Sequence, residues 1–356
     1  MKISTLATLL ATALLCQACT AARMIAFNTP TTHDSELFLN AILPAADTPF
    51  EPSCRVHYNA CPTIDSLFED DYTTGIIILR GDSIIYSRFE GRHTIDTPAD
   101  LFSLSKSFVG ALVGIAISQG YISSPHDPVS KYLPQCAEIL SDSTCVCDLL
   151  NMRSGVHETH WQMAHMYYTP NLDRTTPRTI RRVPHGEYHY ANLSTQLLAC
   201  LIEQATGRPL TDYFIDNYWI PTAPRSEGYW SVDSRRNLNP RAFCGLSITP
   251  IDVLKLGMIY RDGGILNGRQ IVPAEWVHYT VNPPYTSADR GGATYHCQWY
   301  ILEPDTEFMG QGLMGQILYI NRTTDTIVAR FGIRRGKTDW TAELRRISAL
   351  SDRYFR

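Results

Sequence analysis

The order in which strand-like and helix-like segments follow one another most constrains the fold of this 356-residue chain. Residues 74–79 and 83–89 are apolar runs separated by Arg80-Gly81-Asp82, which predicts a strand hairpin with a tight turn. Helix patterns fill the middle of the chain, and strand patterns return in the last hundred residues. We therefore predict an α+β fold, an α/β sandwich. Its antiparallel sheet is built from both termini and flanked by helices, and a mostly helical subdomain at about residues 120–245 is inserted.

The individual segments follow from apolar spacing and from end signals. Helices are predicted at residues 103–120, 193–207, 251–261 and 341–354. Strands are predicted at residues 295–302, 315–321 and 327–332, with turns at 304–305 and 323–325.

Composition limits the classes of function. With 44% hydrophobic residues, 19% charged residues and a net charge of -4, the chain can bury a sizeable core in one large domain or two closely packed subdomains. It lacks the basic excess of a nucleic-acid-binding protein, and its mild acidity indicates no particular partner. The oligomeric state does not follow from these features.

The N-terminus predicts export. Lys2 precedes an apolar run at residues 6–15, which is too short to span a bilayer and is typical of a secretory signal. Cys16-Gln17-Ala18-Cys19 resembles the cleavage box of bacterial lipoproteins. We expect a signal peptide at residues 1–18 and lipidation of Cys19, which would anchor the protein to a membrane as a periplasmic or cell-envelope lipoprotein. Cys16 is the other candidate, and an ordinary signal peptide is the alternative.

The segment after the signal contains several prolines and is predicted to be an irregular tether at residues 19–62, leading into a folded domain at residues 63–356. Eight further cysteines follow residue 19, and an exported setting permits disulfides. Cys54 with Cys61, and Cys136 with Cys145 or Cys147, are close enough in sequence to close small loops, although connectivity cannot be read from sequence.

No metal or cofactor is predicted. Beyond residue 19 the chain has no Cys-x-x-Cys, and His157-Glu158-Thr159-His160 lacks the spacing of the His-Glu-x-x-His zinc motif. His157, His160 and His165 are better interpreted as loop histidines that line a groove.

The stretch Leu101 to Phe108 carries the strongest chemical signal. Ser103 and Lys106 are three residues apart in the first turn of a predicted helix, so their side chains would lie on one face. Lysine acts as a base only when its pKa is lowered, and the apolar residues around Lys106 favour this by desolvation. A capping serine followed by a surface lysine is the simpler explanation. The chain has only five lysines, however, and Lys106 alone has a serine three residues before it.

Two later motifs complete the pattern. Tyr190-x-Asn192 lies just before the helix predicted at residues 193–207, in a turn where both side chains can face one pocket. A core tyrosine and a helix-capping asparagine are the alternative interpretation. Gly310-Gln311-Gly312 lies in the strand-rich C-terminal part.

Together, these motifs make residues 70–350 resemble the serine β-lactamase and penicillin-recognising superfamily. Phe102 to Val109, Asp148 to Gly155, and Gly312-Leu313-Met314-Gly315-Gln316 resemble most the branch of 6-aminohexanoate-dimer hydrolase-like and esterase-like proteins. The resemblance implies that Ser103 is the nucleophile, Lys106 its base and Tyr190 a proton relay. It also implies that Asn192 orients Lys106 or the substrate. The oxyanion hole would use the backbone N–H groups of Ser103 and Leu313, next to Gln311 and Gly312.

The chain departs from the superfamily where its third motif usually begins with lysine or histidine. Gly310 and Gln311 stand there, so a substrate carboxylate would lack its usual cation unless an arginine such as Arg334 reaches in. The sequence also lacks Ser-Asp-Asn and Gly-x-Ser-x-Gly.

We therefore predict an exported serine hydrolase that cleaves an amide or ester of a small molecule or short peptide, more readily than a β-lactam. The alternative is a non-catalytic or slow-acylating penicillin-recognising protein that binds a peptidoglycan-like ligand.

Overall fold

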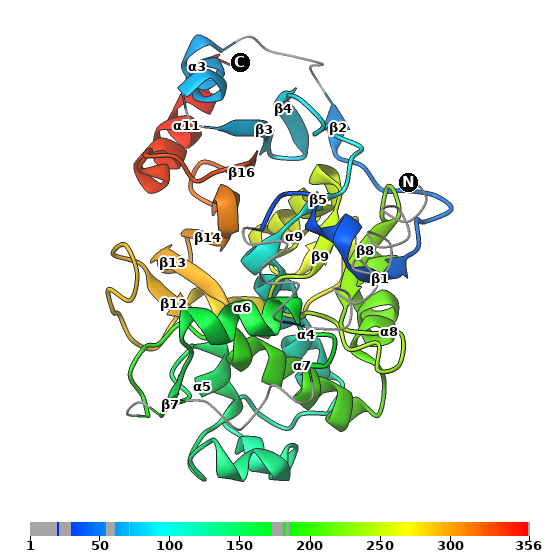
Figure 1. Cartoon of the computed structure of the whole chain (residues 1–356). Coiled ribbons are helices and arrows are strands. Elements are labelled where there is room, and N and C mark those ends of the chain that lie inside the picture. Colours follow the sequence, from blue (N-terminus) through cyan, green and yellow to red (C-terminus); the bar gives the residue numbers. More distant parts are fainter. Residues whose placement is uncertain are drawn as a thin grey trace, which may run out of the picture.

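The computed structural model describes residues 20, 30–54, 61–70, 72–172, 181–182 and 185–354. Within these residues the predicted mixed fold is confirmed: a large antiparallel sheet and a mostly helical region lie side by side (Figure 1). No helix of the described part has both the length and the apolar character needed to span a bilayer.

An eight-stranded sheet joins the two ends of the chain. Its order is β12-β13-β14-β15-β16-β3-β4-β2, and β3 pairs with β16 across about 250 residues of sequence. All its neighbours are antiparallel except the short edge pair β2 and β4. The strands are β2 (Ser53–Cys54), β3 (Thr73–Arg80), β4 (Ser83–Phe89), β12 (Thr294–His296), β13 (Trp299–Glu303), β14 (Glu307–Gly312), β15 (Gln316–Asn321) and β16 (Thr326–Gly332).

The predicted strand at residues 295–302 is divided in two. Cys297 and Gln298 have φ values of 46° and 69°, so the chain reverses there and β12 folds back onto β13. Neither residue type signals a left-handed turn, and the apolar run therefore looks continuous in the sequence.

Helices cover both faces of this sheet, because the side chains of its strands alternate between two cores. Ile76 and Ile78 of β3 face a cluster that contains residues of α3 (Pro62–Asp70) and α11 (Trp340–Tyr354). Ile77 and Leu79 face the larger cluster, which contains residues of α4 (Ser105–Ser118) and α9 (Pro250–Arg261). In Figure 1, α3 and α11 lie together beside the end of the sheet formed by β3 and β16.

The remaining α-helices lie between β4 and β12 in the chain, and a second sheet joins β1 of the N-terminal segment to three strands of this region. The helices are α5 (Val146–Leu150), α6 (His160–Tyr168), α7 (Asn192–Thr206), α8 (Leu210–Phe214) and α10 (Ala274–Val281). The second sheet has the order β1-β8-β9-β5, with β1 (Leu39–Leu43), β8 (Gly228–Val232), β9 (Leu246–Ile248) and β5 (Ala99–Asp100). Two-stranded pairs are β6 (Val156–His157) with β7 (Arg181–Arg182) and β10 (Ile265–Leu266) with β11 (Arg269–Gln270).

The tether predicted at residues 19–62 needs correction. Its described part is bound to the domain, because β1 pairs along its whole length with β8. The Tyr167 hydroxyl donates to Asp34 at 2.7 Å, and the Ser35 N–H donates to Asp100 at 2.9 Å. The prolines mark the ends of short ordered pieces rather than a continuous linker. Cys16, Cys19 and the predicted signal peptide lie outside the described residues.

Both suggested disulfide pairings also need correction. Cys145 and Cys147 are bonded to each other, with Cα atoms 5.3 Å apart. Cys61 and Cys136 are free thiols buried in the two apolar clusters. The side chain of Cys54 lies outside the described part.

Candidate active site

Ser103 lies in a strained turn immediately before a buried helix. The predicted helix at residues 103–120 is in fact a short 3-10 turn, Phe102–Leu104, that continues into α4. Phe102 has a φ of 48°, in the left-handed region that a bulky residue rarely adopts. Strain of this kind persists only where the surrounding structure holds it, and it is common at functional sites. Here it presents Ser103 at a pocket wall.

Lys106 lies one turn later and points back toward the serine. Its Nζ is 3.0 Å from Ser103 Oγ, 2.8 Å from Asn192 Oδ1 and 2.8 Å from the Phe243 carbonyl oxygen. Burial lowers the pKa of Lys106 to about 7, and the nearby positive charge of Arg290 also lowers it. Cys244 and Glu158 act in the opposite direction. A large fraction of Lys106 is therefore neutral near pH 7, with a lone pair that can accept the serine proton.

A second buried lysine shows why the contacts of Lys106 matter. Lys255 of α9 is as deeply buried as Lys106, but its Nζ lies 2.8 Å from the carboxylate of Asp252. Lys106 has no carboxylate at ion-pair distance in the described part of the chain and is held by neutral oxygen atoms instead. Lys255 is therefore suited to a structural ion pair, and Lys106 to gaining and losing a proton.

Tyr190 approaches the same serine from the turn before α7. Its hydroxyl is hydrogen-bonded to Ser103, and burial raises the pKa of Tyr190 to about 12. Lys106 Nζ lies 5.0 Å from the centre of the tyrosine ring. The tyrosine stays protonated at neutral pH, so it can donate a proton while Lys106 accepts one.

Asn192 is the first residue of α7, and Glu158 fixes its position. The buried Glu158 carboxylate accepts hydrogen bonds from the backbone N–H groups of Asn192, at 2.9 Å, and Leu193. A carboxylate that receives the first N–H groups of a helix is favoured by the helix dipole. Sequence reasoning missed this role, because Glu158 attracted notice only within an incomplete zinc motif.

The glycines of Gly310-Gln311-Gly312 let β14 lie against the turn that carries Ser103. A Cβ atom on Gly312 would be 2.1 Å from the Leu101 carbonyl oxygen. A Cβ on Gly310 would be 2.3 Å from Leu104 Cδ1. Both distances are too short for a real contact. The clash at Gly312 is with the backbone, whereas a side chain at Gly310 would require Leu104 to move. The glycine at the first position of the motif thus fits the packing of Leu104 against β14.

Leu313 follows β14 in a short 3-10 turn, Leu313–Gly315, at the edge of the pocket. Met314 in this turn has a φ of 62°. The buried side chain of Arg330 stabilises the turn. The Arg330 guanidinium donates to the carbonyl oxygens of Met314, at 3.0 Å, and Gly315, at 2.8 Å. Arg330 is a further residue that the sequence gave no reason to select.

A pocket of about 700 Å³ opens over Ser103. Tyr190, Asn192, Gln311, Gly312 and Leu313 line it together with Ser103, so the structure brings these predicted site residues to one cavity. Lys106 lies behind the wall. Apolar and aromatic side chains make much of the remaining surface: Phe102, Met163, Ala164, Tyr167, Tyr168, Phe243, Tyr300, Ile317 and Trp340.

The charged groups at the pocket differ from the expectation. Arg334 does not line it and instead stacks on Tyr72, with 5.2 Å between the guanidinium carbon and the ring centre. Arg290 and Arg335 line it. His160 also lines it, although it begins α6 and is not a loop residue.

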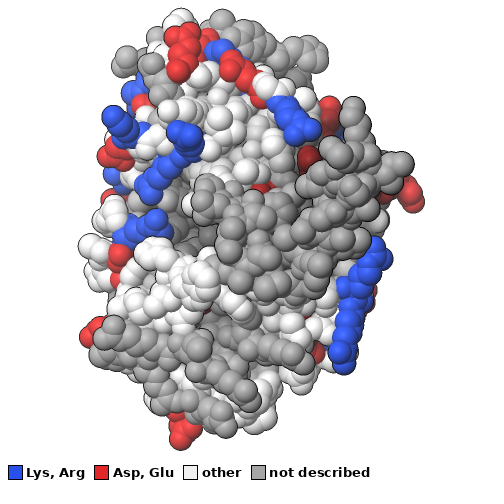
Figure 2. Space-filling view, in the orientation of Figure 1, with Lys and Arg blue, Asp and Glu red and all other residues white. Residues whose placement is uncertain are grey.

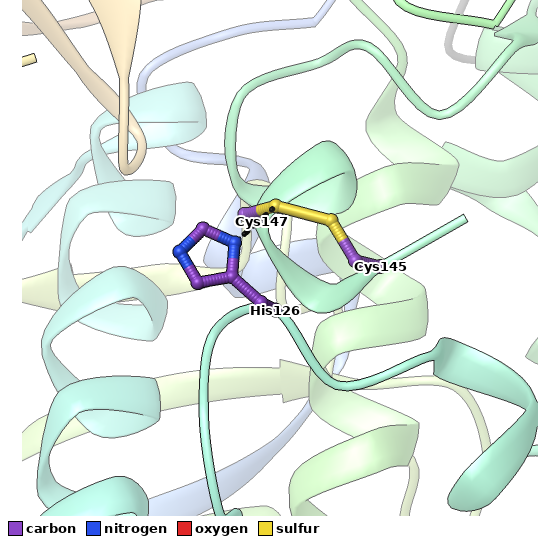
Figure 3. Close-up of side chains that lie close together, drawn as sticks. All are labelled: His126, Cys145 and Cys147. Carbon is purple, nitrogen blue, oxygen red and sulfur yellow. Dashed lines mark hydrogen bonds between the residues drawn. A yellow bond between two sulfur atoms is a disulfide. The ribbon is translucent and has the colours of Figure 1, made fainter. Parts of the chain in front are cut away.

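One group of possible metal ligands lies outside this pocket. Figure 3 shows the His126 ring beside the disulfide between Cys145 and Cys147. The distance from His126 Nδ1 to Cys147 Sγ is 3.7 Å. Metals bind cysteine as thiolate, and sulfur atoms joined in a disulfide do not provide thiolates. This group is therefore described as a disulfide with an adjacent imidazole.

Known proteins resemble this chain over most of its length. The family model described as Beta-lactamase matches residues 69–349. A 6-aminohexanoate-dimer hydrolase of Paenarthrobacter ureafaciens is 25% identical over 312 residues, covering 80% of this chain and 79% of that protein.

Solved structures show the same fold. A Bacillus anthracis protein assigned as 6-aminohexanoate-dimer hydrolase superposes with a TM-score of 0.77 at 18% identity, covering 91% of this chain and 94% of that one. A penicillin binding protein from Bacillus halodurans gives a TM-score of 0.65 at 14% identity, covering 81% and 99%.

Proposed function

The chain belongs to the beta-lactamase family and is a serine hydrolase, and we propose that it cleaves an amide or ester bond through an acyl-enzyme on Ser103. The observation that supports this most is the 3.0 Å approach of Lys106 Nζ to Ser103 Oγ, in a setting that lowers the pKa of the lysine to about 7. An amidase or esterase is favoured over a β-lactamase. The similar Paenarthrobacter protein is named 6-aminohexanoate-dimer hydrolase, and Gly310 stands where the superfamily motif usually has a lysine or histidine.

The first half of the reaction forms the acyl-enzyme. Neutral Lys106 accepts the Ser103 hydroxyl proton as Oγ bonds to the substrate carbonyl carbon. The negative charge that develops on the carbonyl oxygen is stabilised by the backbone N–H groups of Ser103 and Leu313. Tyr190 then donates its proton to the leaving nitrogen or oxygen, and the bond to the leaving group breaks. Lys106 returns the proton to Tyr190.

The second half reverses these roles with water. The same base accepts a proton from water as the water oxygen attacks the acyl carbon, and Ser103 Oγ leaves and regains its proton. The buried Cys244 thiol, next to the lysine, does not compete as a nucleophile, because burial raises its pKa to about 12.

Covalent labelling with a fluorophosphonate probe tests this proposal. Wild type should be labelled, and Ser103→Ala should lose both labelling and turnover of p-nitrophenyl esters and anilides. Ser107→Ala is the matched control. This serine is buried one turn away and donates to the Gln298 carbonyl oxygen, so labelling should persist. Full labelling of Ser103→Ala would show that the nucleophile lies elsewhere.

The alternative, a slow-acylating binding protein for a peptidoglycan-like ligand, predicts a different time course. It would accept the label and release one equivalent of product in a burst, with no steady turnover. Steady turnover of an ester or anilide, absent from Ser103→Ala, would exclude it.

We also propose export and a lipid anchor, on the basis of the N-terminal sequence alone. The apolar run at residues 6–15 and the Ala18-Cys19 pair support it. The full chain should partition into detergent and incorporate a fatty-acid probe in a suitable bacterial host, and Cys19→Ala should do neither. Loss of the probe in Cys16→Ala with retention in Cys19→Ala would move the anchor to Cys16.

A further inference from the structure

The N-terminal segment at residues 30–43 forms part of the wall of the catalytic pocket. Pro30 lines the pocket directly, and a tight turn follows it, in which the Asp34 N–H donates to the Thr31 carbonyl oxygen at 3.2 Å. The Asp34 side chain closes this turn, because its Oδ1 accepts hydrogen bonds from the Thr31 N–H at 2.9 Å and from Thr31 Oγ1 at 2.7 Å. One carboxylate therefore shapes the backbone that brings Pro30 to the pocket.

The second oxygen of the same carboxylate holds another part of the wall. Oδ2 of Asp34 accepts a hydrogen bond from the Tyr167 hydroxyl at 2.7 Å, and the half-buried ring of Tyr167 lines the pocket. Phe38 of the N-terminal segment packs against this ring, with ring centres 5.3 Å apart. Figure 2 shows several acidic side chains at the surface, whereas Asp34 is only 2% exposed. A buried carboxylate destabilises a fold unless it is hydrogen-bonded, so Asp34 depends on the groups that donate to it.

Tyr167 belongs to α6, which contributes a large part of the pocket wall. Besides Tyr167, the residues of α6 that line the pocket are His160, Met163, Ala164 and Tyr168. Arg241 fixes the backbone at the C-terminal end of this helix, because its buried guanidinium donates to the carbonyl oxygens of Tyr167 and Thr169, each at 2.8 Å. The Asp34 contact fixes the direction of the Tyr167 side chain. The position of the Tyr167 ring in the pocket therefore depends on the N-terminal segment.

We propose that Asp34 is a positioning residue that acts through Tyr167 to set the width of the pocket, and with it the preference for the apolar part of a substrate. This inference rests on the proposed hydrolase function and adds a determinant of its specificity. The hydrogen bonds of the Asp34 side chain go to Thr31 and Tyr167 rather than to Ser103 or Lys106. The chemical step with a short substrate therefore does not depend on Asp34, whereas the binding of a longer chain along Tyr167 does.

Two pairs of esters test the proposal. p-Nitrophenyl acetate and octanoate differ in the acyl part, and methyl and octyl butyrate differ in the alcohol, so a contact with either part is detected. The values of kcat and KM are measured for wild type, Asp34→Ala and Tyr167→Phe. In at least one pair, both variants should change the ratio of kcat/KM between long and short ester, Asp34→Ala by about tenfold, the scale on which an apolar pocket distinguishes one methylene. The kcat for the short ester should stay within about twofold of wild type.

A double variant distinguishes action through Tyr167 from a separate effect on folding. In an Asp34→Ala background, Tyr167→Phe should change the ratio no further, because the shared hydrogen bond is already absent. Asp34→Asn should retain part of the wild-type ratio, since its amide oxygen can still accept the Tyr167 hydroxyl. Asn40→Ala is the control. Asn40 secures the same segment through the Ser35 carbonyl oxygen, at 2.7 Å, and Ser231 Oγ, at 2.9 Å, but it does not line the pocket, so the ratio should stay unchanged.

Three results would overturn the assignment: an unchanged ratio in Asp34→Ala and Tyr167→Phe, effects that multiply in the double variant, or an equal change in Asn40→Ala. If Asp34→Ala does not fold, Tyr167→Phe decides, because it keeps the ring and removes only the hydroxyl. Ester turnover and fluorophosphonate labelling of wild type report the hydrolase itself. If both are absent, the proposed function fails. If wild type is active and the ratios are unchanged in the variants, only the role of Asp34 fails.

Discussion

The pH dependence of the reaction should follow the protonation of Lys106. Its pKa is lowered from 10.5 to about 7, chiefly by burial. Only the neutral amine can accept the Ser103 proton, so kcat/KM should rise with pH through this value and then level off. With a pKa of about 7, the neutral fraction is roughly 0.09 at pH 6 and roughly 0.9 at pH 8, a change of about tenfold. A lysine at its ordinary pKa would give a rate that still increases tenfold per unit above pH 8.

The assay uses a neutral p-nitrophenyl ester between pH 5.5 and 9.5, with Ser103→Ala as the blank for spontaneous hydrolysis. A neutral substrate is needed because its own charge does not change across this range. Lys106→Ala should lose about 10² in rate, together with the rise near pH 7. If the rate of Lys106→Ala still rises with pH near 7, another group is the base, and His157, His160 and His189 are the candidates. A wild-type rate that increases without a plateau to pH 9.5 would refute the lowered pKa.

The other predictions concern positioning and stability. Glu158→Gln removes a negative charge that raises the Lys106 pKa, so the rise of kcat/KM with pH should move to lower pH. A shift of this rise to higher pH would contradict the expectation. Gly312→Ala should abolish ester turnover, because its Cβ would lie 2.1 Å from a backbone carbonyl oxygen. Gly91→Ala meets no atom but strains a positive φ of 66°, so it should cost stability and retain turnover. Lys106→Met should be more stable than wild type in acid. Since the folded pKa is the lower one, wild type should regain about 1.4 kcal/mol of unfolding free energy per pH unit above pH 7 relative to the variant, as measured by urea denaturation.

Much of the architecture could be predicted because local signals and the fold agree. The hairpin around Gly81 and the helices that begin near Pro250 and Trp340 carry clear turn, cap and periodicity signals, and they form as expected. The reversal at Cys297 and Gln298 and the pairing of β1 with β8 carry no such signal. They depend on tertiary contacts that a local pattern does not contain.

The candidate site shows the same division. Ser103 and Lys106 are three residues apart, so a helical turn suffices to predict their proximity. The roles of Glu158, Asp34 and Arg330 depend on which backbone groups and side chains meet them after folding. The choice of Arg334 failed because sequence distance from a strand does not determine the direction of a side chain in a loop. The site residues shared with a superfamily motif were therefore accessible from the sequence, and the residues that position them were not.

The pairing of β3 with β16 also determines when during synthesis the enzyme can become active. β3 lies between β4 and β16, and β14, which forms the pocket wall beside Ser103, connects to β3 only through β15 and β16. Ser103 and Lys106 leave the ribosome more than 200 residues before this wall is complete. Long-range pairing of this kind is slow, since a large loop must close first. A growing or truncated chain that lacks β16 carries every residue of the Ser103, Lys106, Tyr190 and Asn192 group but lacks the strand that joins β14 and β15 to β3. We therefore expect hydrolytic activity only after β16 has been made.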